Sequence, residues 1–137
     1  MIAVAAPAVE QGQRSVTDRT GWPVVEVAVG GVEELDVAIG ELEEIVAAEQ
    51  PFALLVSGPT TLAAWERLLW RAPHARRRLR RLRPALGTWC RGTAHVVSDD
   101  ADSPAALRLA GLSWGCAAKA FTDAPAARSW LHGSLAR

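Results

Sequence analysis

The chain has little of several residue types, and each shortage excludes a class of protein. Its two cysteines, Cys90 and Cys116, are far apart and show no CxxC spacing, so the sequence predicts neither a disulfide-stapled domain, a zinc site nor a redox dithiol. No apolar run approaches the roughly twenty residues that cross a bilayer. Residues 1–13 contain no basic residue before or within their apolar stretch, which argues against a secretory signal. We therefore expect a cytoplasmic protein without a membrane span, a metal or a cofactor.

The charges that are present balance overall but are separated along the chain. Fifteen Lys and Arg residues match fifteen Asp and Glu residues among 137, so the net charge is zero. Eight acidic residues and no basic one lie from Glu26 to Glu49, whereas nine arginines and no acid lie from Arg67 to Arg91. A neutral chain has little bulk attraction for nucleic acid, but two segments of opposite sign can guide a specific contact.

The apolar pattern predicts strands and helices in alternation. Valine-rich residues 22–29 and the apolar run 51–57 are typical of strands, and the second is apolar enough to be covered on both faces. Further strands are expected over 14–20 at an edge, 93–98 and 115–121. Helices are expected over 32–48, from Thr60 or Thr61 to Pro73, over about 74–86, over 103–112 and from 122–123 to about 133. Pro84 is expected to kink or end its helix, because proline lacks an N–H donor and clashes with the preceding turn.

This order of elements predicts the fold class. Strands joined by helices of this length run parallel, with right-handed crossovers. The sequence shows no repeat and no linker that would divide it. We therefore expect a tail over residues 1–13 and one α/β domain over residues 14–135, with a sheet of four to five strands flanked by helices.

Three stretches resemble the small bacterial SpoIIAA-like proteins, relatives of the STAS domain (the sulfate-transporter and anti-sigma-factor-antagonist group). They are VVEVAVGG with the amphipathic helix and PFALLVS that follow it, RLRPALGTWCRGTAHVVS, and the ending FTDAPAARSWL. The similarity runs from about Arg14 to Leu131. It implies a STAS-like, mixed and mainly parallel sheet whose first strand is antiparallel, and a non-catalytic scaffold that serves as a regulatory or binding module.

The same resemblance suggests a switch. In anti-sigma antagonists, a partner kinase phosphorylates a Ser or Thr at the start of the helix after the central strand. The matching hydroxyls are those of Thr60 and Thr61, with Ser57 just before them. Ser57 stands where an acid often closes this strand, and the Asp-Ser pair that precedes the helix in the family is missing.

Polar residues also follow the predicted strands, at their carboxyl ends. In open α/β sheets, ligands bind outside the carboxyl ends of the strands, near helix N-termini. That rule selects Ser57, Thr60, Thr61 and Ser98 as ligand-binding or switch residues. Ordinary helix capping explains the same residues without a ligand.

Trp70, Trp89 and Trp114 occupy helix ends or joins. Aromatic side chains there can line a pocket for a hydrophobic molecule, or they can simply pack helix ends on the sheet. If such a pocket were catalytic, His95 with Asp99 or Ser57 would supply its acid–base chemistry. His95 inside a strand, with Thr93 and Val97 on the same face, is equally typical of a core histidine.

The charged helices offer a candidate interaction surface. Its residues are Arg76, Arg77, Arg80 and Arg81 in the basic segment, with Glu41 and Glu44 in the acidic one. Three interpretations remain, in order of preference. The arginines form a solvated face, the basic helix pairs with the acidic helix within the molecule or across a homodimer, or the arginines bind nucleic acid.

Taken together, these residues favour a non-catalytic binding or regulatory module of the STAS/SpoIIAA-like type, acting through protein–protein contacts or a small apolar ligand. The alternative is a small enzyme that tailors a hydrophobic metabolite in a Trp-lined pocket. Nucleic-acid binding through the Arg-rich helix is the least favoured.

Overall fold

The computed structural model of the chain describes residues 16–98 and 114–137. Its five-stranded sheet follows the order of the sequence: β1 (Thr17–Asp18), β2 (Val24–Ala28), β3 (Phe52–Ser57), β4 (Cys90–Val96) and β5 (Ala118–Phe121). β1 is antiparallel to β2, and the other neighbours are parallel. The expected α/β class and mixed, mainly parallel sheet are therefore confirmed.

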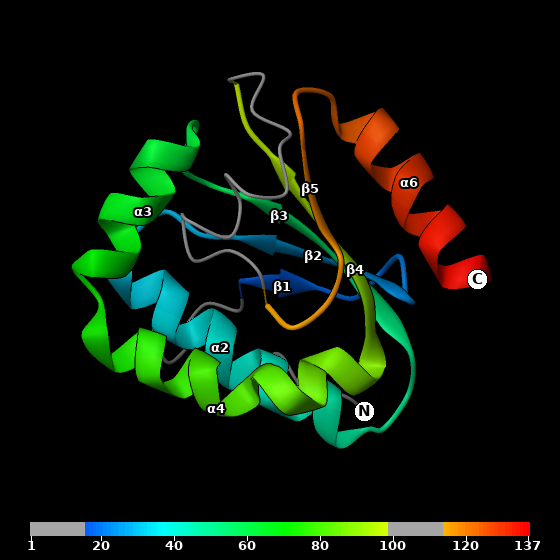
Figure 1. The fold of residues 1–137 in the computed structure, drawn as a ribbon, viewed down its shortest axis with the longest axis horizontal. Helices are drawn as coiled ribbons and strands as arrows, with labels where there is room; N and C mark the ends of the chain where they lie inside the picture. The colour runs from blue at the N-terminus through cyan, green and yellow to red at the C-terminus, as the bar shows by residue number, and fades with distance from the viewer. Residues whose placement is uncertain (1–15, 99–113) are drawn as a thin grey trace.

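Helices cover both faces of this sheet (Figure 1). The described part of the chain contains α2 (Val32–Ala47), α3 (Leu62–Trp70), α4 (Pro73–Trp89) and α6 (Ala124–Ala136). The first three lie on one face and α6 lies on the other. None of these helices is long and apolar enough to cross a membrane. The helix expected over residues 103–112 lies outside the described residues.

β3 is the centre of the sheet and divides the core in two. Phe52, Leu54 and Val56 face the larger core under α2, α3 and α4, whereas Ala53 and Leu55 face the smaller core under α6. Successive side chains of a strand point to opposite faces, so a strand covered on both sides must be apolar throughout. The run FALLV satisfies this requirement, as the sequence predicted.

The basic helix does not end at Pro84, and that part of the expectation is wrong. α4 continues to Trp89, and β4 consequently begins at Cys90 rather than at residue 93. Pro84 cannot donate a backbone hydrogen bond, but it lies on the exposed side of the helix, where water can satisfy the carbonyl left without a donor. Leu82 and Leu86 continue the buried seam past it. Packing of that seam stabilises the helix across the proline. The last helix likewise ends at Ala136, beyond residue 133.

β1 is shorter than expected and depends on an acidic side chain of α2. The amides of Val16 and Thr17 both donate to Oε1 of Glu41, at 3.0 and 3.1 Å. Arg19 and Glu44 form an ion pair at 3.5 Å beside them. Two of the predicted interaction residues, Glu41 and Glu44, thus hold the edge of the sheet on α2.

Candidate functional site

Three of the four predicted hydroxyl residues, Thr60, Thr61 and Ser98, meet at the carboxyl edge of the sheet. The Thr61 side chain caps α3 by accepting from the Ala64 amide at 3.0 Å. The Thr60 carbonyl accepts from both the amide and the hydroxyl of Ser98, at 2.6 and 2.9 Å, which ties the turn before α3 to the end of β4. Capping therefore accounts for Thr61, and the fold brings Thr60 and Ser98 together.

A pocket of about 440 Å³ lies at this edge, between the N-termini of α2 and α3. Its lining residues are Val29, Gly30, Gly31, Gly58, Pro59, Thr60, Ala64, Leu68 and Arg71. The Gly30 amide donates to the carboxylate of Glu34, so the acid of α2 already occupies that donor. Arg71 is the one charged group among the described lining residues. This composition suits binding of an apolar group near a carboxylate rather than acid–base chemistry.

Ser57 belongs to a different pocket, on the α6 face. That pocket has a volume of about 340 Å³, and its lining residues are Val16, Asp18, Glu26, Val27, Ala28, Leu55, Ser57, Val96, Ala124 and Arg128. Glu26 and Arg128 pair across it at 2.7 Å. Hydrogen bonding by the Thr20 side chain, together with the hydrogen bond from the Thr20 amide, lowers the pKa of the Asp18 carboxyl.

His95 is a core residue and does not meet Ser57. Its ring is fully buried between two indoles, with centroids 5.7 Å from Trp65 and 5.8 Å from Trp114. His95 pairs in register with Val56 and faces α3, whereas Ser57 faces α6. Asp99 lies outside the described residues. The described structure thus does not assemble His95 with Ser57 into an acid–base pair.

The tryptophans do not share one pocket either. Trp114 is buried beside His95, and Trp89 packs half-buried against the same core. Trp130 lies on the opposite face of the sheet, where its ring is 5.7 Å from Phe121. Trp70 alone among the predicted pocket residues is 70% exposed. Packing explains the buried indoles, and the exposed one requires a separate explanation.

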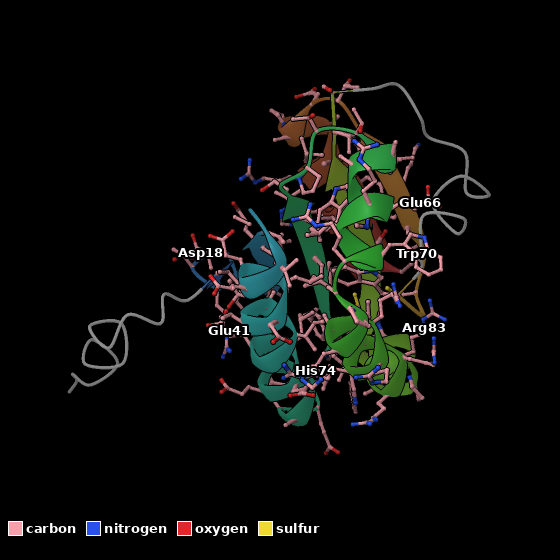
Figure 2. All side chains as sticks on the ribbon, turned by 90° about the vertical axis from the view of Figure 1, so that its left-hand side faces the viewer. Asp18, Glu41, Glu66, Trp70, His74 and Arg83 are labelled. Atoms are coloured by element: carbon pink, nitrogen blue, oxygen red, sulfur yellow. The ribbon has the colours of Figure 1, made fainter. Side chains whose placement is uncertain are left out.

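Trp70 lies beside one guanidinium group, at the junction of two helices that carry several exposed arginines. The Arg76 guanidinium is 4.7 Å from the Trp70 ring and also donates to the Leu69 carbonyl at 2.8 Å, so it fixes the indole between α3 and α4. We call this region the arginine surface. It comprises Arg67, Trp70 and Arg71 with Arg76, Arg77, Arg80, Arg81 and Arg83. Figure 2 shows Trp70 and Arg83 on one side of the molecule, and Asp18 and Glu41 on the other.

Most arginines of this surface have no partner among the residues that the structure describes. Six of them are exposed and form no hydrogen bond or ion pair with any described residue through their side chains: Arg67, Arg71, Arg77, Arg80, Arg81 and Arg83. Arg78 differs, since its position in the helix turns it toward α2, where it pairs with Asp36 and Glu43 at 3.0 Å each. The second of the three interpretations, pairing of the basic with the acidic helix, therefore holds within the molecule at Arg78, through Asp36 and Glu43 rather than the predicted Glu41 and Glu44.

Sequence reasoning missed the contribution of α3 to this surface. Arg67, Trp70 and Arg71 are three and four residues apart, so they share one helix face, and that spacing was available in the sequence. The decisive fact, that Trp70 stays outside the core, depends on how α3 packs.

No cluster of three or more His, Cys, Asp or Glu residues that could hold a metal ion occurs within residues 16–98 and 114–137. Comparison with protein-family models, with curated proteins and with solved structures found no match for this chain. Its function must therefore be argued from the geometry of its own residues.

Proposed function

We propose that this chain is a cytoplasmic, non-catalytic binding module of the STAS/SpoIIAA-like type that recognises an acidic segment of a partner protein through the arginine surface. One observation carries the proposal: α3 and α4 present six exposed guanidinium groups without a described intramolecular partner, and Arg76 holds an indole that is 70% exposed between the same two helices. Trp and Arg are the residues that most often dominate the energy of protein interfaces. The planar guanidinium fork also matches a carboxylate in a two-point contact.

The surface is partly ordered before any partner binds. Arg76 holds the Trp70 ring through a cation–π contact and is itself held by the Leu69 carbonyl. A side chain that is already fixed loses less conformational freedom on binding than a free one. Trp70 is therefore suited to act as the apolar anchor of the contact, with the arginines around it.

The carboxyl-edge pocket adjoins this surface. Arg71 lines the pocket and also belongs to the arginine surface, since it follows Trp70 directly at the end of α3. Leu68 and Ala64 form the apolar wall on the same helix. A partner segment that pairs a carboxylate with Arg71 can insert a neighbouring apolar side chain into the pocket, which favours acidic segments that contain an aliphatic residue.

The distribution of acidic residues favours a protein over a nucleic acid. α2 packs beside α4 and exposes Glu33, Glu34 and Glu44, and Glu66 lies in α3 close to Trp70 (Figure 2). A long polyphosphate approaches these carboxylates as well as the arginines, and the repulsion weakens its binding. A short acidic segment can contact the arginines of α4 while lying near fewer of these carboxylates.

Binding of a defined probe tests the proposal. A short fluorescein-labelled, Glu-rich peptide with one Leu is titrated with the chain at low salt, and its anisotropy is followed. The double variant Arg77→Ala/Arg80→Ala should bind roughly fivefold to tenfold more weakly than wild type. The control Arg19→Ala/Arg128→Ala removes the same charge away from the arginine surface and should stay within about twofold of wild type.

Other outcomes would assign the surface differently. An equal loss in both double variants would contradict a specific arginine surface. Tighter binding of a DNA or RNA oligonucleotide, with a steep salt dependence, would transfer the function to nucleic acid. Concentration-dependent dimerisation that Arg77→Ala/Arg80→Ala abolishes would make the partner a second copy of the chain.

The α6-side pocket supports a second candidate function, binding of a small apolar ligand. Its volume of about 340 Å³ falls in the usual range for ligand pockets, and Val27, Leu55 and Val96 supply an apolar lining. A straight-chain fatty acid should then raise the melting temperature of the chain. Ala28→Phe, which fills this pocket, should abolish the shift, whereas Ala63→Phe on the exposed side of α3 should not.

A further inference from the structure

Cys90 and Cys116 converge on one buried hydroxyl. Oγ1 of Thr93 lies 3.7 Å from the Cys90 sulfur and 3.2 Å from the Cys116 sulfur. Each thiol also shifts the pKa of the other, and the Cys90 thiol donates to the Gly92 carbonyl at 3.4 Å. Both cysteines are free thiols. The structure therefore contains a close dithiol that the sequence separation did not predict.

The two cysteines are brought together at the point where α4 ends and β4 begins. Cys90 caps the end of α4 and is the first residue of β4, and the Thr93 amide donates to the Ala117 carbonyl at 2.8 Å. Gly115 has a φ of +87°, and a Cβ there would lie 2.6 Å from the Arg83 carbonyl oxygen. Only glycine lets this segment lie against α4, and the next residue is Cys116.

The surroundings give the two thiols different chemistry. Hydrogen bonds from Cys90 and Thr93 favour the thiolate of Cys116 and lower its pKa. Cys116 is also half-exposed. The hydrogen bond with Cys116, together with burial, raises the pKa of Cys90. Its position at the C-terminus of α4, the negative end of the helix dipole, acts in the same direction. Cys116 is thus the accessible nucleophile and Cys90 the buried, protonated neighbour.

We propose that Cys90 and Cys116 form a reversible intrachain disulfide, with Cys116 as the attacking thiol, Cys90 as the resolving thiol and a low-molecular-weight disulfide as the oxidant. The Cys116 thiolate attacks one sulfur of the oxidant, whose S–S bond breaks and releases one thiolate. Cys90 then loses its proton and attacks the Cys116 sulfur, which forms the intrachain bond and releases the second thiolate. The protein loses two electrons and two protons, and the oxidant becomes two thiols.

Glutathione disulfide is the probe for the test. The native chain is incubated with defined ratios of reduced and oxidised glutathione, quenched with an alkylating reagent and analysed by intact mass. The expected product has lost two hydrogens, carries no alkyl group and no glutathione, and returns to the dithiol with excess reduced glutathione. Two alkylated thiols at every ratio would overturn the proposal.

Single variants assign the two roles. Cys90→Ala should accumulate a mixed disulfide on Cys116, because the resolving thiol is missing. Cys116→Ala should remain unmodified, because Cys90 is buried. Equal adduct formation in both variants would contradict the assignment. If a variant fails to fold, the alkylation rates of the two cysteines are measured on the native wild-type chain, by analysing the peptide that contains each one. Cys116 should react at least roughly tenfold faster than Cys90.

The pH at which alkylation of Cys116 reaches half of its maximal rate is a further test. A general loss of folded protein lowers the amount of native chain but does not change this midpoint. The rate at Cys116 should reach half of its maximum below the pH typical of an ordinary thiol, because only the thiolate reacts. Thr93→Val keeps the shape of the side chain but removes a hydrogen bond to the thiolate, so this midpoint should move to higher pH. Thr88→Val removes a hydroxyl that bonds the Pro84 carbonyl instead, and should leave the midpoint unchanged.

Discussion

At the scale of single residues, Gly58 positions the turn that forms the carboxyl-edge pocket. Its φ is +152°, a conformation that side chains with a Cβ rarely adopt. A Cβ built there would overlap the carbonyl oxygen of Val29 at the end of the neighbouring strand. The turn therefore lies directly on that strand end, and the adjacent Thr60 and Thr61 are placed by this contact.

Gly58→Ala should destabilise the fold by roughly 2–4 kcal/mol, because the added methyl group meets backbone and the dihedral angle is strained. Urea denaturation followed by circular dichroism measures the change. Gly133→Ala is the matched control, since a Cβ there meets nothing within 4 Å in α6, and alanine should stabilise that helix by up to about 1 kcal/mol. Equal effects of the two substitutions would contradict the close approach at Gly58.

Single residues also show where prediction from sequence stops. The apolar alternation correctly placed Thr93, His95 and Val97 on one face of a strand, and Thr61 was correctly given as a possible cap. The meeting of Cys90 with Cys116 was not predicted. It depends on the register of β4 with β5, which pairs Thr93 with Ala118, and no local pattern determines that register.

At the scale of elements, the position of each arginine around α4 decides its role. Arg77, Arg80 and Arg81 lie opposite the buried seam of Leu79, Leu82 and Leu86 and remain exposed. Arg78 turns toward α2 and bonds the side chain and the carbonyl of Asp36, at 3.0 and 3.3 Å, as well as Glu43. Hydrogen bonds to these carboxylates raise the pKa of Arg78. α4 thus supplies both an internal clamp, formed by Arg78 with Asp36 and Glu43, and the exposed arginines of the arginine surface.

Arg78→Ala should therefore destabilise the chain by about 1 kcal/mol, because three contacts between α4 and α2 are lost from a side chain that is 23% exposed. Arg81→Ala, from an exposed position of the same helix, should change the free energy of unfolding by less than about 0.5 kcal/mol. Chemical denaturation at low and high salt measures both. A salt-independent loss at Arg78, or an equal loss at Arg81, would argue against the clamp.

The elements themselves were largely predictable because their patterns are local. The stripe of Leu35, Ile39 and Leu42 predicted α2, and the continuous apolar run predicted the central strand β3. The end of the basic helix, expected at Pro84 or about residue 86, lies at Trp89 because the local penalty of proline competes with a buried seam that continues past it. The exposure of Trp70 was likewise unpredictable, since an apolar side chain on a helix gives no sign of whether another element will cover it.

At the scale of the whole molecule, the zero net charge is the sum of two regions of opposite sign. α2 carries the acids and uses Glu41, Glu44, Asp36 and Glu43 for internal contacts, whereas the arginine surface keeps six guanidinium groups free of described partners. Several acids of this region thus have partners within the fold, although some remain exposed, whereas most of the arginine surface has no described partner. This difference, rather than the net charge, favours an acidic partner.

The indole N–H signals of the six tryptophans test this claim most directly in one NMR titration with the Glu-rich peptide. Trp70→Phe identifies the Trp70 signal. If the arginine surface binds the peptide, the Trp70 signal should shift and saturate, while the signals of buried Trp65 and Trp114 stay in place. The shift should vanish with a Lys-rich peptide of the same length. A Trp70 signal that stays in place while the peptide binds, or that moves equally with both peptides, would contradict the proposed function.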